Sequence, residues 1–245
     1  MANKEVFMAR LPRLYIPGCS QHVIRRGNNR QACFFTEADY TVYLDKLKEA
    51  SENYQVAIHA FVLMTNHVHL LVTPSSQEGV ARMMQAVGRY YVRYINTVYQ
   101  RSGTLWEGRY KSTLVDNDYY FLTVSRYIEL NPVRAKMVEH PSEYLWSSYQ
   151  GNGLGKEIQL LTSHELYMGL GKSKVSRQKN YCHLFDGVIE KHTLEEIRYK
   201  TNKSWVLGSE KFKEDVRKMV DRRVESSGWG GDRKSIDYKS RTLTP

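Results

Sequence analysis

The segment Asn66-His67-Val68-His69-Leu70-Leu71-Val72 decides both the predicted fold and the predicted chemistry of this chain. It sets two histidines two residues apart in an apolar, β-branched run, a pattern typical of a strand. Because positions i and i+2 of a strand face the same way, His67 and His69 are expected to project together while Val68 turns to the opposite face. Two imidazoles on one face offer a divalent cation two ligands. Taken alone, the pattern also fits two polar residues on a half-exposed strand.

The sequence around this segment predicts an α+β fold. Strands are expected over residues 14–26, 56–64 and 67–73 and at the end of 104–116, and helices over 36–53, 79–100 and 119–131. The turn at Thr65-Asn66 makes the second and third strands a hairpin, and Pro132 closes the last helix or starts a new turn. The order β-α-β-β-α-β-α predicts a ferredoxin-like antiparallel sheet with helices on one face.

The rest of the chain is expected to extend this domain. We assign residues 1–150 to the sheet domain and residues 151–225 to a mainly helical C-terminal extension that includes a charged helix over 209–224. Residues 226–245 are rich in Gly, Ser and charge, and are expected to form a disordered tail.

The composition favours an anionic partner. Thirty-six Lys and Arg against 26 Asp and Glu give a net charge of +10, which places nucleic acid first among partners, and 18 tyrosines offer rings that stack on unpaired bases. No apolar run reaches about 18 residues, so no membrane partner is expected. Three widely spaced cysteines and a start without an apolar signal core predict a reduced, cytoplasmic, nucleoid-associated protein.

A second motif supplies a candidate nucleophile. Tyr127 and Asn131 are four residues apart on a predicted helix, so they share one face. A tyrosine hydroxyl is a candidate nucleophile, and an asparagine carbonyl is a candidate ligand for a hard cation. In isolation, the same residues fit a packed tyrosine and a helix-terminal asparagine before proline. Tyr119 and Tyr120 are alternative nucleophiles, but neither has an Asn or Gln four residues further on.

Together these motifs resemble a known family. The chain is similar to the HUH single-tyrosine (Y1) transposases of the IS200/IS605 type and, more closely, to the REP-associated tyrosine transposases. The resemblance spans about residues 10–150, with a weaker echo over 201–208, and rests on four motifs: His22-Val23-x-x-Arg26-Gly27-Asn28-x-Arg30, His67-Val68-His69, Leu105-Trp106-Glu107-Gly108-Arg109-Tyr110-Lys111-Ser112, and Arg126-Tyr127-Ile128-Glu129-Leu130-Asn131-Pro132-Val133-Arg134-Ala135. Insertion-sequence enzymes usually carry Gln where this chain has Asn131, and Asn is the form of the REP-associated branch.

The resemblance implies an HUH endonuclease-like fold and a specific reaction. His67, His69 and Asn131 would hold Mg²⁺ or Mn²⁺, and Tyr127 would attack a phosphorus of single-stranded DNA beside a hairpin, leaving a 5′-phosphotyrosine and a free 3′-OH. The expected assembly is a monomer or a homodimer. The expected phosphate contacts are Arg25, Arg26, Arg30, Arg89, Arg93, Arg109 and Lys111.

Two other functions stay open from the sequence. One is a nucleic-acid-binding protein that keeps the fold without catalysis. The other is a metal phosphoesterase that uses the two histidines and an activated water, with Tyr127 in a structural role. Only the tyrosine mechanism produces a covalent protein–DNA adduct.

Overall fold

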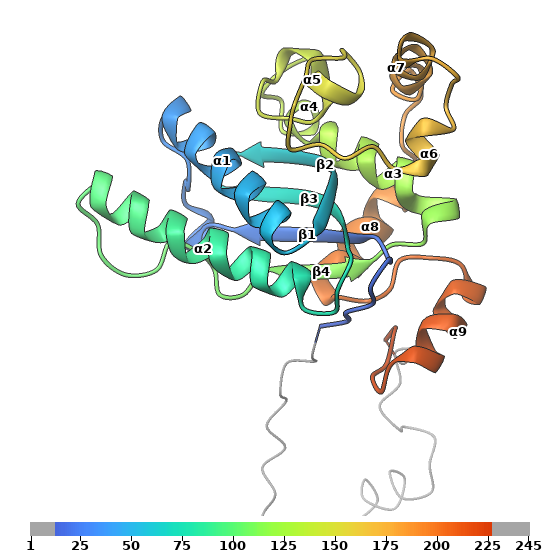
Figure 1. The fold of residues 1–245 in the computed structure, drawn as a ribbon, viewed down its shortest axis with the longest axis horizontal. Helices are drawn as coiled ribbons and strands as arrows, with labels where there is room; N and C mark the ends of the chain where they lie inside the picture. The colour runs from blue at the N-terminus through green and yellow to red at the C-terminus, as the bar shows by residue number, and fades with distance from the viewer. Residues whose placement is uncertain (1–12, 227–245) are drawn as a thin grey trace, which may run out of the picture.

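A single antiparallel sheet organises the protein (Figure 1). The computed structural model describes residues 13–226. Within that range, the four strands of the sheet are β1 (Gln21–Arg26), β2 (Val56–Met64), β3 (His67–Pro74) and β4 (Lys111–Leu114). Their spatial order is β2-β3-β1-β4, and all neighbours pair antiparallel. The predicted α+β class and antiparallel sheet are confirmed.

Helices cover both faces of this sheet. On one face lie α1 (Glu37–Asn53) and α2 (Gly79–Val98), which share a core with alternate residues of β3 such as Val68 and Leu70. On the other face α3 (Asn117–Glu129) and α8 (Lys191–Lys203) form a second core that includes Leu71. The prediction of helices on one face was therefore wrong for the helix after β4. Strands β2 and β3 carry buried apolar residues on both faces, such as Val68 and Leu71 of β3, so a second helical layer is needed to bury them.

Local sequence signals set the start of one helix as predicted and shift two other boundaries. Helix α1 begins after Thr36, whose side chain forms a capping box with Asp39. The predicted first strand is shortened to β1, because Pro17 and Gly18 make a turn in which Gly18 has a φ of 73°. The helix containing Tyr127 ends at Glu129, and a separate helix, α4 (Asn131–Arg134), follows with Pro132 in its first turn.

The segments after residue 135 pack against the sheet domain. Their helices are η2 (Pro141–Glu143), α5 (Tyr149–Asn152), α6 (Glu165–Met168), α7 (Lys174–His183), α8 and α9 (Glu210–Met219), and a further short helix, η1 (Asn28–Arg30), follows β1. Leu207 pairs with Val115 beside β4, so this part extends the sheet's edge. The boundary at residue 150 stays a prediction, and the predicted tail from 227 onward lies outside the described residues. No helix in residues 13–226 has the length and apolarity of a membrane span.

Candidate active site

Strand β3 brings both histidines to one face. Val68 is buried in the core beneath α1 and α2, and the alternation of the strand turns His67 and His69 the opposite way, toward α3. In the β1–β3 register Arg26 lies opposite His67 and Ile24 opposite His69. Residues paired directly across an antiparallel ladder share a face, so Arg26 stands beside His67.

Helix α3 places Tyr127 over these histidines. The tyrosine is 5% exposed, and its ring centre lies 5.9 Å from that of His69 and 5.7 Å from that of His22 on β1. Asn131 begins α4 directly after the break in the helix, and its Nδ2 donates to the Tyr127 carbonyl at 3.4 Å. The Asn131 side chain lies close enough to His67 to oppose the lowering of that histidine's pKa by burial, so it also reaches the histidine pair.

The hydrogen bonds of His67 leave one ring nitrogen open. Its Nδ1 lies 2.7 Å from Oδ1 of Asn66, whose Nδ2 donates to the Arg30 carbonyl at 2.8 Å. The amide oxygen only accepts, so Nδ1 of His67 carries the proton and Nε2 keeps its lone pair. On the other histidine, Nδ1 of His69 lies 2.8 Å from Nε2 of His22.

Burial keeps both histidines neutral. It lowers the pKa of His67 to about 4, with a smaller contribution from the Arg26 charge. It also lowers the pKa of His69, assisted by His22, His67 and Arg134. Neutral imidazole is the form that binds metal, and two imidazoles with an amide oxygen fit a divalent cation. Within residues 13–226 no three His, Cys, Asp or Glu side chains form a metal cluster, so Asn131 would be the third protein ligand.

Arg134 is a site residue that the sequence reasoning did not assign. Its guanidinium carbon lies 4.3 Å from the centre of the Tyr127 ring, and its Nη2 donates to the Tyr127 carbonyl. Burial lowers the pKa of Arg134 to about 10, and attraction to Tyr127 opposes that shift, so the side chain is charged at neutral pH. Its Nη1 is buried without a hydrogen-bond partner in the described part of the chain. The seven-residue spacing from Tyr127, two helical turns, was the available signal.

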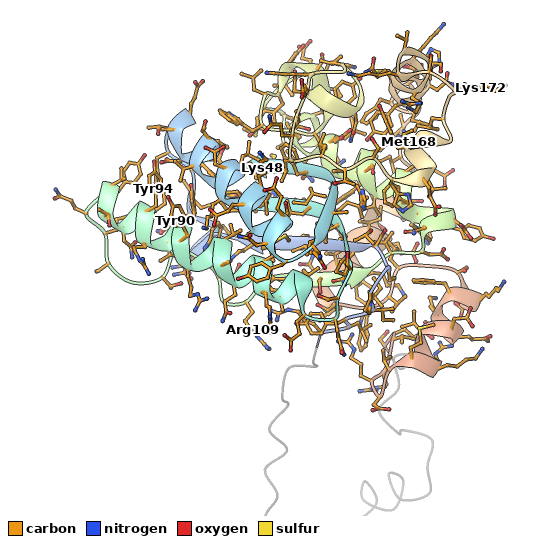
Figure 2. All side chains as sticks on the ribbon, viewed as in Figure 1. Lys48, Tyr90, Tyr94, Arg109, Met168 and Lys172 are labelled. Carbon is orange, nitrogen blue, oxygen red and sulfur yellow. The ribbon has the colours of Figure 1, made fainter. Side chains whose placement is uncertain are left out.

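Three of the predicted phosphate contacts gather in one basic pocket. Arg26, Arg109 and Lys111 line a pocket of about 450 Å³, together with Arg13 and Lys203, which the sequence reasoning missed. Figure 2 shows Arg109 beyond α2, near the β4 edge of the sheet. Because Arg26 pairs with His67, this pocket adjoins the histidine pair.

The other predicted contacts lie elsewhere. Strand alternation turns Arg25 to the opposite face from Arg26, where its Nη1 donates to the Met84 carbonyl of α2 at 2.8 Å. Arg89 and Arg93 are exposed on α2, also on the far side of the sheet from Tyr127. Arg30 is exposed in η1, and its carbonyl accepts the Asn66 bond described above.

The two alternative nucleophiles have other surroundings. Tyr119 is 70% exposed, and the Tyr120 hydroxyl donates to Glu196 of α8 at 2.7 Å. Neither residue contacts the rings of the histidine pair, whereas Tyr127 does.

Comparison with known proteins shows a family match and a related fold. Residues 15–131 match the family model described as "Transposase IS200 like". A solved structure of a REP-associated tyrosine transposase bound to a REP hairpin is 18% identical, with a TM-score of 0.53 over 64% of this chain and 93% of that chain. A protein from Deinococcus radiodurans assigned as a transposase is 20% identical, with a TM-score of 0.36 over 49% of this chain and 96% of that chain. A comparison with curated protein sequences gives no match.

Proposed function

This chain belongs to the IS200-like Y1 transposase family through residues 15–131, and from that premise we propose that it cuts and rejoins single-stranded DNA through Tyr127. The observation that carries the proposal is the meeting of Tyr127 from α3 with His67 and His69 from β3, 5.9 Å between the rings of Tyr127 and His69. A nucleophile and a pair of cation ligands on one buried face are the parts that a phosphoryl transfer needs.

The proposed step balances without a nucleotide cofactor. The Tyr127 oxygen attacks a backbone phosphorus, the bond from phosphorus to the 3′ oxygen breaks, and that oxygen leaves as a 3′-OH with the proton given up by the tyrosine. The product is a 5′-phosphotyrosine, and attack by another 3′-OH reverses the step. Arg134, charged and packed on the Tyr127 ring, would stabilise the phenolate as it forms.

A divalent cation belongs to this proposal through the residues that would hold it. His67, His69 and Asn131 offer two neutral imidazoles and an amide oxygen, and Mg²⁺ or Mn²⁺ bound there would polarise a non-bridging oxygen of the phosphate. Cleavage that proceeds fully in EDTA would remove the cation from the proposal.

The DNA is proposed to be a single strand beside a hairpin. The fold-related REP-associated transposase was solved with a REP hairpin, and the basic pocket next to His67 offers this chain a path for phosphates. We expect tighter binding to a hairpin with a single-stranded flank than to a random linear strand of equal length at physiological salt. Equal affinity would contradict this choice of substrate.

The test of the reaction is a trapped adduct. Wild-type protein is incubated with the hairpin strand and Mn²⁺, the products are separated under denaturing conditions, and the modified peptide is mapped by mass spectrometry. We expect an adduct on Tyr127, none in Tyr127→Phe, which keeps the ring and its packing, and an adduct in the matched control Tyr119→Phe.

Three other results would contradict this proposal. Cutting at the wild-type rate by Tyr127→Phe would indicate a phosphoesterase that activates water. Binding without any cutting by the wild-type protein would indicate a non-catalytic binding protein. An adduct on another residue would overturn the assignment of Tyr127.

A further inference from the structure

A chain of hydrogen bonds runs from the C-terminal extension to the buried histidine of the pair. The Thr201 hydroxyl of α8 lies 2.7 Å from the Ile197 carbonyl and 3.0 Å from Nδ1 of His22, and Nε2 of His22 lies 2.8 Å from Nδ1 of His69. We propose that Thr201 and His22 are positioning residues, which hold His69 in the tautomer that leaves its Nε2 lone pair open to a cation.

The positions of the protons follow from counting donors. A carbonyl only accepts, so the single Thr201 proton goes to Ile197, and the Thr201 oxygen then accepts from Nδ1–H of His22. A neutral His22 with its proton on Nδ1 accepts at Nε2, so Nδ1 of His69 must be the donor. His69 therefore carries its proton on Nδ1 and its lone pair on Nε2.

The opposite assignment of donors and acceptors is disfavoured at the contact between Thr201 and Ile197. If Thr201 donated to His22, the Thr201 and Ile197 oxygens would face each other at 2.7 Å with no proton between them. Both oxygens are acceptors, and Thr201 and His22 are fully buried, so water does not separate them.

The tertiary structure positions the three residues of this hydrogen-bond chain, Thr201, His22 and His69. His22 and Leu71 are partners in the β1–β3 ladder, which sets His22 two pairs away from His69 on the same face of the sheet. Helix α8 is fixed over β4 and β1, with Thr113 of β4 donating to the Lys200 carbonyl at 3.2 Å. Thr201, which lies 179 positions from His22 in sequence, thus determines which ring nitrogen of His69 carries the proton.

The hydrogen-bond chain gives His69 the same tautomer as His67. Asn66 fixes the proton of His67 on Nδ1 by a separate route, so each imidazole presents an Nε2 lone pair. Partners that orient metal-binding histidines in this way typically change metal affinity by about 10- to 100-fold when they are removed. The inference rests on the proposed function only in that the lone pairs serve a cation.

The matched variants are Thr201→Val and Thr201→Ser. Valine keeps the branched shape without the hydroxyl, and serine keeps the hydroxyl. Histidine tautomers are read in the metal-free protein at neutral pH by long-range ¹H–¹⁵N NMR, which distinguishes protonated from unprotonated ring nitrogens. Binding of Mn²⁺ alone is measured by titration with electron paramagnetic resonance.

We expect wild-type protein and Thr201→Ser to show His69 protonated at Nδ1. In Thr201→Val, His22 loses its acceptor, so a population of His69 protonated at Nε2 should appear and Mn²⁺ affinity should fall about 10-fold or more. The His67 tautomer should stay unchanged in all three proteins, because its proton is fixed by Asn66.

Three results would overturn the proposal that Thr201 and His22 fix the tautomer of His69. These are a wild-type His69 protonated at Nε2, an unchanged His69 tautomer in folded Thr201→Val, or loss of the tautomer in Thr201→Ser. If Thr201→Val does not fold, the wild-type and serine spectra still decide. Because these spectra need neither DNA nor cleavage, absence of a Tyr127 adduct would refute the proposed function and leave the positioning roles of Thr201 and His22 standing.

Discussion

We expect His59 on β2 to make the unfolding free energy of the protein fall as the pH is lowered. Its Nδ1 donates to the Thr162 carbonyl at 2.7 Å, which fixes its Nε2 as the acceptor of the Thr73 hydroxyl at 2.9 Å. The residue is 7% exposed, and burial lowers its pKa from 6.5 to about 4, although the bond to Thr162 opposes the shift. The native fold therefore holds His59 neutral in a place where the unfolded chain takes up a proton.

The sign and size of the effect follow from linkage. A lowered folded pKa contributes stability that is present above pH 6.5 and is lost as the pH falls toward 4, because the unfolded state then binds more protons. Lowering the pKa from 6.5 to about 4, at about 1.36 kcal/mol per pH unit, corresponds to a loss of about 3 kcal/mol between pH 7 and pH 4.

The perturbation is His59→Gln, which keeps a polar side chain but does not titrate. At pH 7 the variant should be less stable by about 2 kcal/mol, from weakened hydrogen bonds and packing. At pH 4 the wild-type protein has lost its contribution from His59, so the difference should shrink to zero or favour the variant by about 1 kcal/mol.

The assay is urea unfolding followed by tryptophan fluorescence at pH 7, 5.5 and 4. His192→Gln, an exposed histidine in the first turn of α8, controls for the loss of a histidine as such and should change stability by less than about 0.5 kcal/mol. A stability difference for His59→Gln that is the same at pH 7 and pH 4 would refute the reasoning.

Two further predictions concern a buried network and the DNA path. The fully buried Glu129 side chain accepts hydrogen bonds from three side chains, among them Tyr181 at 2.8 Å. Glu129→Ala should therefore lower the unfolding free energy by about 3 to 5 kcal/mol, and Glu129→Gln should lower it by clearly less. Equal losses for the two variants in chemical denaturation would refute a hydrogen-bonding role. Arg26→Ala should reduce the log–log salt slope of hairpin binding by about 1, as measured by fluorescence anisotropy, whereas Arg89→Ala on the far side of the sheet should leave the slope unchanged. Equal slopes for the two variants would move the DNA path away from the basic pocket.

Short-range pattern determined a large part of this protein. Strand alternation was enough to put His67 and His69 on one face, helical spacing was enough to put Asn131 one turn from Tyr127, and Thr36 with Asp39 marked the start of α1. These features depend on residues within a few positions of each other, and backbone geometry links such residues directly.

Only the tertiary structure decided which distant residues join the site. Adjacent Arg25 and Arg26 look equivalent in sequence, yet the β1–β3 register sets Arg26 beside His67 and turns Arg25 under α2. Likewise, the packing of α8 over β4 and β1 brings Thr201 to His22. Pairing register and helix placement depend on how separate apolar faces are buried together, so residues far apart in sequence become neighbours through the core and not through their spacing.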